Sequence, residues 1–170
     1  MRLFIAIPFS EEFKGELLRV QKDMRQNGVR GNFSRAENLH VTVAFLGEVS
    51  DPAPAMNALQ SVPLPGLTLS LSRLGNFGEL LWIGLQKNDA LDRYVADVRA
   101  ALDEAGVPYD RKKFRPHVTL VRRAEWPYDL QVSDLAEAPR ASMDVERVCL
   151  MKSERIGGKL VYTPVGEVKK

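Results

Sequence analysis

The chain contains only two histidines, His40 and His117, and each one opens the same tripeptide, His-Val-Thr. A chance repeat of this kind is expected about once in 100 cases, even when the preference of Val and Thr for strands is allowed for. Residues i and i+2 of a strand share a face, so each threonine would lie about 7 Å from its histidine on the same side. With Thr42 and Thr119 as these partners, each predicted strand offers an imidazole and a hydroxyl, and apolar neighbours cover its opposite face.

Two imidazoles and two hydroxyls in one pocket suit the cleavage of a phosphodiester. The unperturbed pKa of histidine, about 6.5, allows one ring to be neutral while the other is protonated. The neutral ring can take a proton from water or a hydroxyl, and the protonated ring can give one to the departing oxygen. The threonine hydroxyls can donate to the non-bridging oxygens. Arg122 can add a bidentate contact that stabilises charge in the transition state.

Other interpretations of the two histidines stay open from the residues alone. A single histidine on a strand is usually structural, and the duplication is what favours catalysis here. A metal site lacks the nearby Asp, Glu or Cys that would complete three or four ligands, so we expect neither a metal nor a cofactor. A further alternative is a non-catalytic module that binds RNA ends or nucleotides and uses both rings only as donors to phosphate.

Two more candidate residues, Phe45 and Arg122, each lie five positions past a histidine. A regular strand would send this odd offset to the opposite face from the histidine. We favour core packing for Phe45 and keep the alternative that its ring stacks on a nucleobase of the substrate. For Arg122 we favour a place at the site, because strand ends often contain bulges and a core-facing arginine would be costly.

The elements that must position these residues alternate between strands and helices. Hydrophobic periodicity, caps and turn residues predict strands at residues 2–9, 39–49, 67–74, 79–86, 117–123, 145–154 and 159–168, and helices from Ser10 to Gly28, over 52–62, and from Asn88 or Asp89 to Gly106. Hairpin turns are expected at residues 75–78 and at Gly157-Gly158. Hairpins dominate over βαβ crossovers, which predicts an α+β fold with mainly antiparallel sheets and helices on the outside. Because a helix followed by His-Val-Thr occurs once in each half of the chain, we expect two lobes with one motif each.

The composition is that of one folded domain. The chain has 170 residues, of which 45% are hydrophobic and 27% are charged, and no linker divides it, so we expect residues 1–170 to form a single domain. The net charge of +2 does not fit a protein that coats duplex nucleic acid. A local basic cluster at residues 111–115 and 122–123 is either a solvated loop or a rim that faces phosphate.

The sequence also bears on the protein's surroundings. No apolar stretch is long enough for a membrane helix, and the start of the chain is too quickly polar for a signal peptide, so we expect no membrane association and no export. The single cysteine, Cys149, has no partner for an internal disulfide, which fits the cytoplasm. Nothing in the sequence requires a protein partner or more than a monomer.

Two longer motifs carry a resemblance to a known family. They are Asn-Leu-His-Val-Thr-Val-Ala-Phe-Leu-Gly at residues 38–47 and Phe-Arg-Pro-His-Val-Thr-Leu-Val-Arg at residues 114–122. They resemble the paired signatures of the 2H phosphoesterase superfamily, and more narrowly those of bacterial and archaeal RNA 2′,3′-cyclic phosphodiesterases, historically named 2′-5′ RNA ligases. The segments 2–8, 152–155 and 162–164 are also similar to that group, so the resemblance covers most of the chain.

The resemblance implies a bilobal α+β fold with two antiparallel sheets that flank a cleft, and a metal-independent reaction. Members open the 2′,3′-cyclic phosphate at an RNA end to a 2′-phosphomonoester. Carried over to this chain, His40 would be the proton donor to the departing 3′ oxygen and His117 the proton acceptor that activates water. Thr42, Thr119 and Arg122 would hold the phosphate.

Substrate contacts are less well defined by the resemblance. Phe45 and Arg115 are our candidates for contact with the rest of the substrate. Where the family commonly carries an aromatic and basic pair near a Val-Arg-Trp-like stretch, this chain has Arg-Gly-Asn-Phe-Ser-Arg at residues 30–35, so the family's contacts to the base are not carried over to it. Ligation, the attack of a 5′-hydroxyl on the same cyclic phosphate, is the alternative reaction, and the far higher concentration of water favours hydrolysis unless the cleft excludes it.

Overall fold

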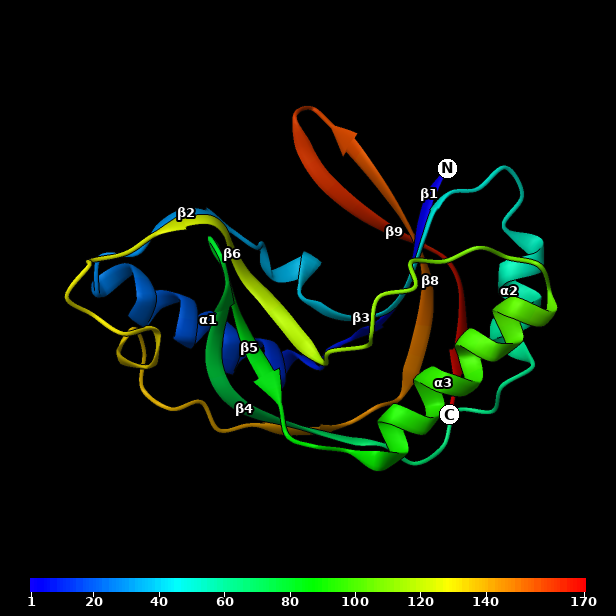
Figure 1. The fold of residues 1–170 in the computed structure, drawn as a ribbon, viewed down its shortest axis with the longest axis horizontal. Coiled ribbons are helices and arrows are strands. Elements are labelled where there is room, and N and C mark those ends of the chain that lie inside the picture. The colour runs from blue at the N-terminus through cyan, green and yellow to red at the C-terminus, as the bar shows by residue number, and fades with distance from the viewer.

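The computed structural model describes residues 1–170 and contains two antiparallel sheets flanked by three α-helices (Figure 1). The first sheet, here called the His40 sheet, has the strand order β3 (His40–Glu48), β1 (Arg2–Pro8), β8 (Arg147–Ile156) and β9 (Lys159–Lys169). The second, the His117 sheet, has the order β2 (Arg30–Phe33), β6 (His117–Glu125), β5 (Leu80–Leu85), β4 (Thr68–Phe77) and β7 (Ser142–Asp144). The helices are α1 (Glu11–Gln26), α2 (Ala53–Gln60) and α3 (Asp89–Glu104), with short 3₁₀ turns at Ala36–Asn38 and Val132–Asp134. The predicted α+β fold with one His-Val-Thr motif per sheet is confirmed.

The helix caps follow from the sequence. The Ser10 hydroxyl accepts a hydrogen bond from the Phe13 amide at 3.2 Å and begins α1, and the Asn88 side chain accepts from the Leu91 amide at 3.0 Å and begins α3. Gly106 follows α3 with φ of +69°, a conformation that favours glycine over other residues. Caps of this kind are local, which explains why the helix limits could be predicted.

Two details of the strands differ from the prediction. The turn between β4 and β5 lies at Gly78-Glu79, because β4 continues through Gly75 to Phe77. Gly75 pairs with Trp82, whose ring lies so close that a Cβ at position 75 would collide with it. The short strands β2 and β7 were not predicted; each has fewer than five residues and lies at an edge of the His117 sheet. Strands this short carry too little alternation to be recognised from sequence.

The helices α1 and α3 each pack on the sheet that does not contain the strand just before them. α1 follows β1 of the His40 sheet, yet Gln21 of α1 donates a hydrogen bond to the Leu120 carbonyl in β6 of the His117 sheet. α3 follows β5 of the His117 sheet, yet Arg99 of α3 donates to the Val43 carbonyl in β3 of the His40 sheet. Figure 1 shows α1 beside β2, β5 and β6, and α2 and α3 at the far end beside the His40 sheet. The two sheets are therefore tied together by exchanged helices.

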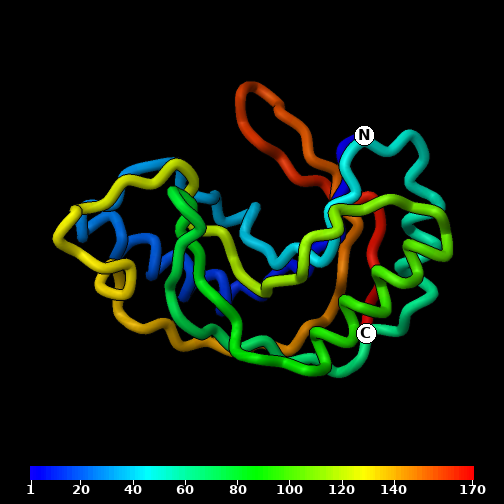
Figure 2. Tube along the Cα trace, viewed as in Figure 1, coloured from blue at the N-terminus to red at the C-terminus, as the bar shows by residue number.

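A continuous hydrophobic cluster of 40 buried residues runs through both sheets. Apolar residues of α1 such as Phe13 and Leu17 belong to it, as do Leu91 and Val98 of α3, at the spacing expected of amphipathic helices. The chain trace in Figure 2 shows the two halves meeting in the middle, with both termini on the side of α2 and α3. None of the helices is both long enough and apolar enough to cross a membrane.

Candidate active site

A cleft with a volume of about 1330 Å³ holds all seven residues that the sequence singled out. They come from the strands β3 and β6 of the two sheets and from the segment just before β6. The seven are His40, Thr42, Phe45, Arg115, His117, Thr119 and Arg122. Two motifs that are 77 positions apart in the sequence therefore face one groove.

A β-bulge interrupts each histidine strand at the same distance from its histidine. In β6, Thr119 pairs with Trp82 and Val121 pairs with Leu81, so Leu120 is an extra residue between two neighbours on β5. In β3, Thr42 pairs with Ala6 and Ala44 pairs with Ile5, so Val43 is the extra residue. In both strands the third and fourth residues after the histidine are consequently both buried. A bulge of this kind reverses the alternation of faces.

Because of this reversal, the fifth residue after each histidine faces the cleft. These two residues are Phe45 on β3 and Arg122 on β6. The core position that we favoured for Phe45 is wrong, because 42% of the side chain is exposed, although its ring centroid lies 5.7 Å from that of Phe4. The bulge that we invoked for Arg122 is present. It is followed by Arg123 with φ of +50°, a sparsely populated conformation for a residue other than glycine.

The two imidazoles make the same kind of hydrogen bond to the backbone. Nδ1 of His40 lies 2.6 Å from the Asn38 carbonyl oxygen, and Nδ1 of His117 lies 2.6 Å from the Arg115 carbonyl oxygen. A carbonyl only accepts, so Nδ1 carries the proton in both rings. Nε2 is then the nitrogen that can hold or release a second proton, and the carbonyl fixes the orientation of the ring.

The surroundings of His40 favour its neutral form. Its ring packs against Phe4 and Tyr162, with centroids 5.0 and 5.4 Å away, and Nε2 lies 2.9 Å from the Thr42 hydroxyl oxygen. Loss of solvent lowers the pKa of His40 from 6.5 to about 4; the Asn38 carbonyl opposes this, while the charges of Arg122 and His117 add to it. A pKa of about 4 leaves His40 neutral at pH 7.

His117 rests on aromatic rings of the other sheet. Its ring centroid is 5.4 Å from that of Phe77, edge to face, and 6.3 Å from that of Trp82. No side chain hydrogen-bonds to Nε2 of His117, whereas Nε2 of His40 contacts the hydroxyl of Thr42. The equivalent hydroxyl, that of Thr119, is free to face a ligand.

The rest of the cleft is strongly basic. Arg111 of the predicted basic cluster pairs with Asp103 at 2.6 Å, but other members of that cluster line the cleft, so part of it is a solvated loop and part is a rim of the site. Only two acidic residues belong to the lining, Asp110 and Glu154. Nine basic ones do: Arg2, Arg35, Arg99, Lys112, Lys113, Arg115, Arg122, Arg155 and Lys159. Such a lining attracts an anionic ligand.

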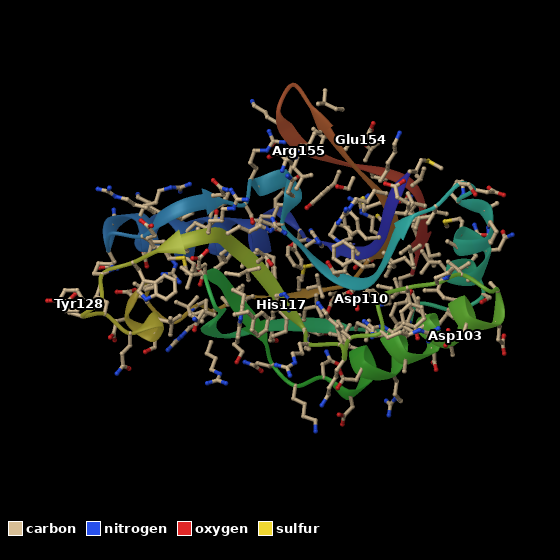
Figure 3. All side chains as sticks on the ribbon, turned by 45° about the horizontal axis from the view of Figure 1, so that its top comes forward. Asp103, Asp110, His117, Tyr128, Glu154 and Arg155 are labelled. Atoms are coloured by element: carbon tan, nitrogen blue, oxygen red, sulfur yellow. The ribbon has the colours of Figure 1, made fainter.

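The end of the β8–β9 hairpin forms one rim of this cleft. Figure 3 shows His117 at the start of β6, Asp110 nearby, and Glu154 and Arg155 on the hairpin that projects beyond the body of the molecule. Arg35 and Asn38 donate to the Leu160 carbonyl at 2.9 and 3.0 Å and tie the hairpin to the segment before β3.

Several residues in the cleft or next to its histidines were missed from sequence. Tyr162, Phe77 and Trp82 support the histidine rings from positions remote in the chain, and no spacing links them to the motifs. The segment 30–35, where the chain departs from the family pattern, contributes Asn32, Phe33, Ser34 and Arg35 to the lining. Gly31 within it is closely packed, since a Cβ there would lie 2.9 Å from the Arg122 carbonyl oxygen. No three His, Cys, Asp or Glu side chains lie together in a way that could hold a metal ion.

The family model described as the 2′-5′ RNA ligase superfamily matches residues 12–157 of the chain. A protein named RNA 2′,3′-cyclic phosphodiesterase from Geobacillus stearothermophilus is 32% identical over 148 residues, which are 82% of this chain and 47% of that protein, so the chain spans about half of that relative. A protein of the same name from Escherichia coli K12 is 31% identical over 128 residues, 72% of each chain. The relative from Thermotoga maritima, again with this name, is 26% identical over 181 aligned positions and covers 100% of this chain and 92% of its own.

Solved structures share the fold over nearly the whole chain. The crystal structure of E. coli LigT complexed with 3′-AMP superimposes with a TM-score of 0.81 at 26% identity, covering 99% of this chain and 96% of LigT. The structure of TT0787 from Thermus thermophilus gives the same TM-score of 0.81 at 26% identity, with 99% and 97% covered. Both the fold and the sequence motifs thus place the chain among the same proteins.

Proposed function

Because the chain belongs to the 2′-5′ RNA ligase superfamily, we propose that it hydrolyses RNA-terminal 2′,3′-cyclic phosphodiesters to 2′-phosphomonoesters. One observation carries this proposal: His40 and His117, from different sheets, line one basic cleft, and each has Nδ1 held by the carbonyl of the residue two positions before it. Relatives that bear the name RNA 2′,3′-cyclic phosphodiesterase support the same reaction.

In the proposed reaction, water attacks the phosphorus atom of the cyclic phosphate. Nε2 of His117 accepts a proton from this water as the new P–O bond forms. The bond between phosphorus and the 3′ oxygen breaks, and Nε2 of His40 gives its proton to that oxygen, which leaves a 3′-hydroxyl and a 2′-phosphate. Thr42, Thr119 and Arg122 hold the non-bridging oxygens, and Arg122 stabilises the added negative charge.

The donor role of His40 requires a higher pKa when substrate is bound, since a pKa of about 4 leaves the ring neutral at pH 7. Part of this lowering comes from the positive charges of Arg122 and His117. A bound phosphodiester brings a negative charge that offsets them and raises the pKa of His40. With its pKa raised, the ring would take up from solvent the proton that it later donates.

The nucleotide next to the cyclic phosphate has contacts available on both sides of the cleft. Phe45 offers an exposed aromatic face on which a base can stack, and Arg115 offers a charge to the sugar-phosphate chain. The proposed partners are RNA ends or nucleotides that carry a 2′,3′-cyclic phosphate. The excess of basic over acidic residues in the lining supports an anionic substrate.

The direct test is incubation with an RNA oligonucleotide that ends in a 2′,3′-cyclic phosphate, in the presence of excess chelator. We expect conversion to the 2′-phosphate, separable by chromatography. Unchanged substrate alongside tight binding would support the non-catalytic module instead. Turnover that disappears with chelator would contradict the metal-free part of the proposal. A second RNA strand with a 5′-hydroxyl, supplied in the same assay, distinguishes ligated from hydrolysed product.

Further parts of the proposal concern the whole chain. We propose that residues 1–170 act as a single domain with one catalytic histidine per lobe, because one hydrophobic cluster of 40 residues joins the two sheets. We also propose a monomer in the cytoplasm. The buried, unpaired Cys149 agrees with a reducing compartment. Size-exclusion chromatography with light scattering tests the monomer.

A further inference from the structure

Two side chains outside the proposed proton-transfer and phosphate-binding groups occupy equivalent places in the two halves. Gln21 lies on α1 and Arg99 on α3. Both helices have 16 residues, and each of these side chains lies ten positions after the first residue of its helix. The equivalence suggests a common task for an amide and a guanidinium group.

Gln21 donates hydrogen bonds to two backbone carbonyls on the side of the His117 sheet. Its Nε2 donates to the Leu120 carbonyl at 3.0 Å and to the Ser34 carbonyl at 2.9 Å. The side chain is only 1% exposed and is the one polar residue that is fully buried in the chain. A buried amide of this kind is retained where its hydrogen bonds are needed, since an apolar side chain would pack there more easily.

Arg99 joins the corresponding carbonyls of the His40 half. Its Nε and Nη2 donate to the Val43 carbonyl at 3.2 and 3.1 Å, and its Nη1 donates to the Lys112 carbonyl at 2.9 Å. Like Gln21, Arg99 thus binds two carbonyls, although it does so with three hydrogen bonds rather than two. In each half, one carbonyl belongs to a histidine strand and the other to the segment that runs beside that strand.

The strand carbonyls are those of the bulge residues. Val43 and Leu120 are the extra residues in β3 and β6, each three positions after the histidine. Each outer segment also donates directly to its strand, although at different positions: the Ser34 amide donates to the Leu120 carbonyl at 2.9 Å, and the Asp110 amide donates to the Phe45 carbonyl, two residues after the bulge residue, at 2.8 Å. We call the Gln21 and Arg99 contacts the two bulge bridges.

We propose that Gln21 and Arg99 are paired positioning residues, whose bulge bridges keep β6 and β3 in the register that presents Arg122 and Phe45 to the cleft. Without the bulge, strand alternation would carry the fifth residue after each histidine to the face away from the site. Each bridge also holds the outer segment against the strand. The kinetic part of this inference rests on the proposed function, whereas its structural part does not.

The test uses variants that remove the donors and keep the volume of the side chain. Gln21→Met and Arg99→Met each lose the bridge. In Arg99→Gln the amide nitrogen is the same number of bonds from Cα as Nε of arginine, so it can restore the contact with Val43 but not the contact with Lys112. Gln26→Met and Arg93→Met are matched controls, because both positions are exposed on the same two helices.

We expect kcat for the cyclic phosphate to fall by about tenfold to 100-fold in Gln21→Met, with a smaller change in KM, because small displacements of reacting groups have effects of this size. In Arg99→Met we expect mainly a rise in KM, of up to about tenfold, because this bridge presents Phe45, which acts on binding. Arg99→Gln should restore most of the wild-type KM. The control variants should match the wild type.

A spectroscopic measurement separates positioning from a general loss of stability. The chain has two histidines, so its imidazole ¹⁵N signals can be assigned to single rings. We expect Gln21→Met to move the His117 signals more than those of His40, and Arg99→Met to do the reverse. If Gln21→Met does not fold, Gln21→Asn, which keeps the amide but shortens its reach, replaces it.

Unmoved imidazole signals together with wild-type kcat and KM, in variants that only melt at a lower temperature, would overturn the inference. Failure of Arg99→Gln to recover activity would overturn the role of the Val43 contact. If the wild type hydrolyses no cyclic phosphate but the signals move as expected, the proposed function fails while the bulge bridges stand.

Discussion

The two halves of the cleft have the same backbone design and different surroundings. In both halves, the carbonyl two residues before the histidine lies next to Nδ1 of the ring. A threonine stands two residues after the histidine, and the bulge residue stands three residues after it. His40, however, is enclosed by Phe4 and Tyr162, and its Nε2 contacts Thr42. His117 lies on Phe77 and Trp82 with Nε2 open to the cleft.

This difference shows how a repeated motif can place two imidazoles in unlike surroundings. The tripeptide and the bulge set where each ring lies, and the packing around it sets its pKa. Burial lowers the pKa of His40 to about 4, and the charges of Arg122 and His117 across the cleft push it in the same direction. Equivalence of the backbone therefore does not imply equivalence of the chemistry.

Removal of the imidazoles gives the largest expected effect. His40→Ala and His117→Ala should each lower kcat for the cyclic phosphate by between about 10² and 10⁴-fold, the usual contribution of a general acid or base. The pH profile alone cannot assign the roles, because the active form carries one proton on the pair whichever ring is the donor. An aryl phosphodiester with a nitrophenolate leaving group, which needs no proton, can assign them.

We expect His40→Ala to keep more activity than His117→Ala on this aryl phosphodiester. The opposite order would exchange the donor and acceptor roles. Circular dichroism of both variants checks that the fold is intact.

The second largest expected effect on kcat comes from removing the guanidinium of Arg122, which follows the bulge in β6. Arg122→Gln should lower kcat by about 10² to 10³-fold, because in the proposed reaction Arg122 stabilises charge in the transition state. Arg93→Gln, at an exposed position of α3 outside the cleft, is the matched control and should keep wild-type kinetics. A change confined to KM would show that Arg122 only binds the substrate.

Phe45, which occupies the equivalent position on β3, should affect the binding of substrate rather than kcat. Phe45→Ala should raise KM by about tenfold with little change in kcat, since stacking of a base on an aromatic ring contributes roughly 1–3 kcal/mol. The effect should shrink for a cyclic phosphate without a nucleobase. Tyr128→Ala, at a fully exposed position away from the cleft, serves as the control. Equal KM values for Phe45→Ala and the wild type would remove Phe45 from the substrate site.

The smallest expected effect is on titration and stability. His40 in the phosphate-free protein should titrate near pH 4 by NMR, and inorganic phosphate should raise this pKa. The unfolded chain, with a histidine pKa near 6.5, then binds more protons than the folded chain between pH 4 and 6.5. The contribution of His40 to stability is therefore full above pH 6.5 and is lost as the pH falls toward 4. A His40 pKa of 6.5 or above without phosphate would contradict the desolvation argument.

Much of the architecture could be predicted because its signals are local. Ser10 and Asn88 cap the helices that their positions suggest, and Gly157-Gly158 turns β8 into β9. The edge strands β2 and β7 could not be predicted, because their few residues acquire strand geometry only by pairing with β6 and β4. The exchange of α1 and α3 between the sheets was equally hidden, since periodicity identifies an apolar face but not the surface that it covers.

The pair of identical motifs could be recognised in the sequence, because the repeat of a rare residue and the two-residue period of a strand are properties of the chain alone. The direction of Phe45 could not, because it depends on a bulge in β3. The low pKa of His40 could not either, because it depends on aromatic rings and charges from distant segments. Register and solvation are set by packing partners, and a linear pattern does not contain them.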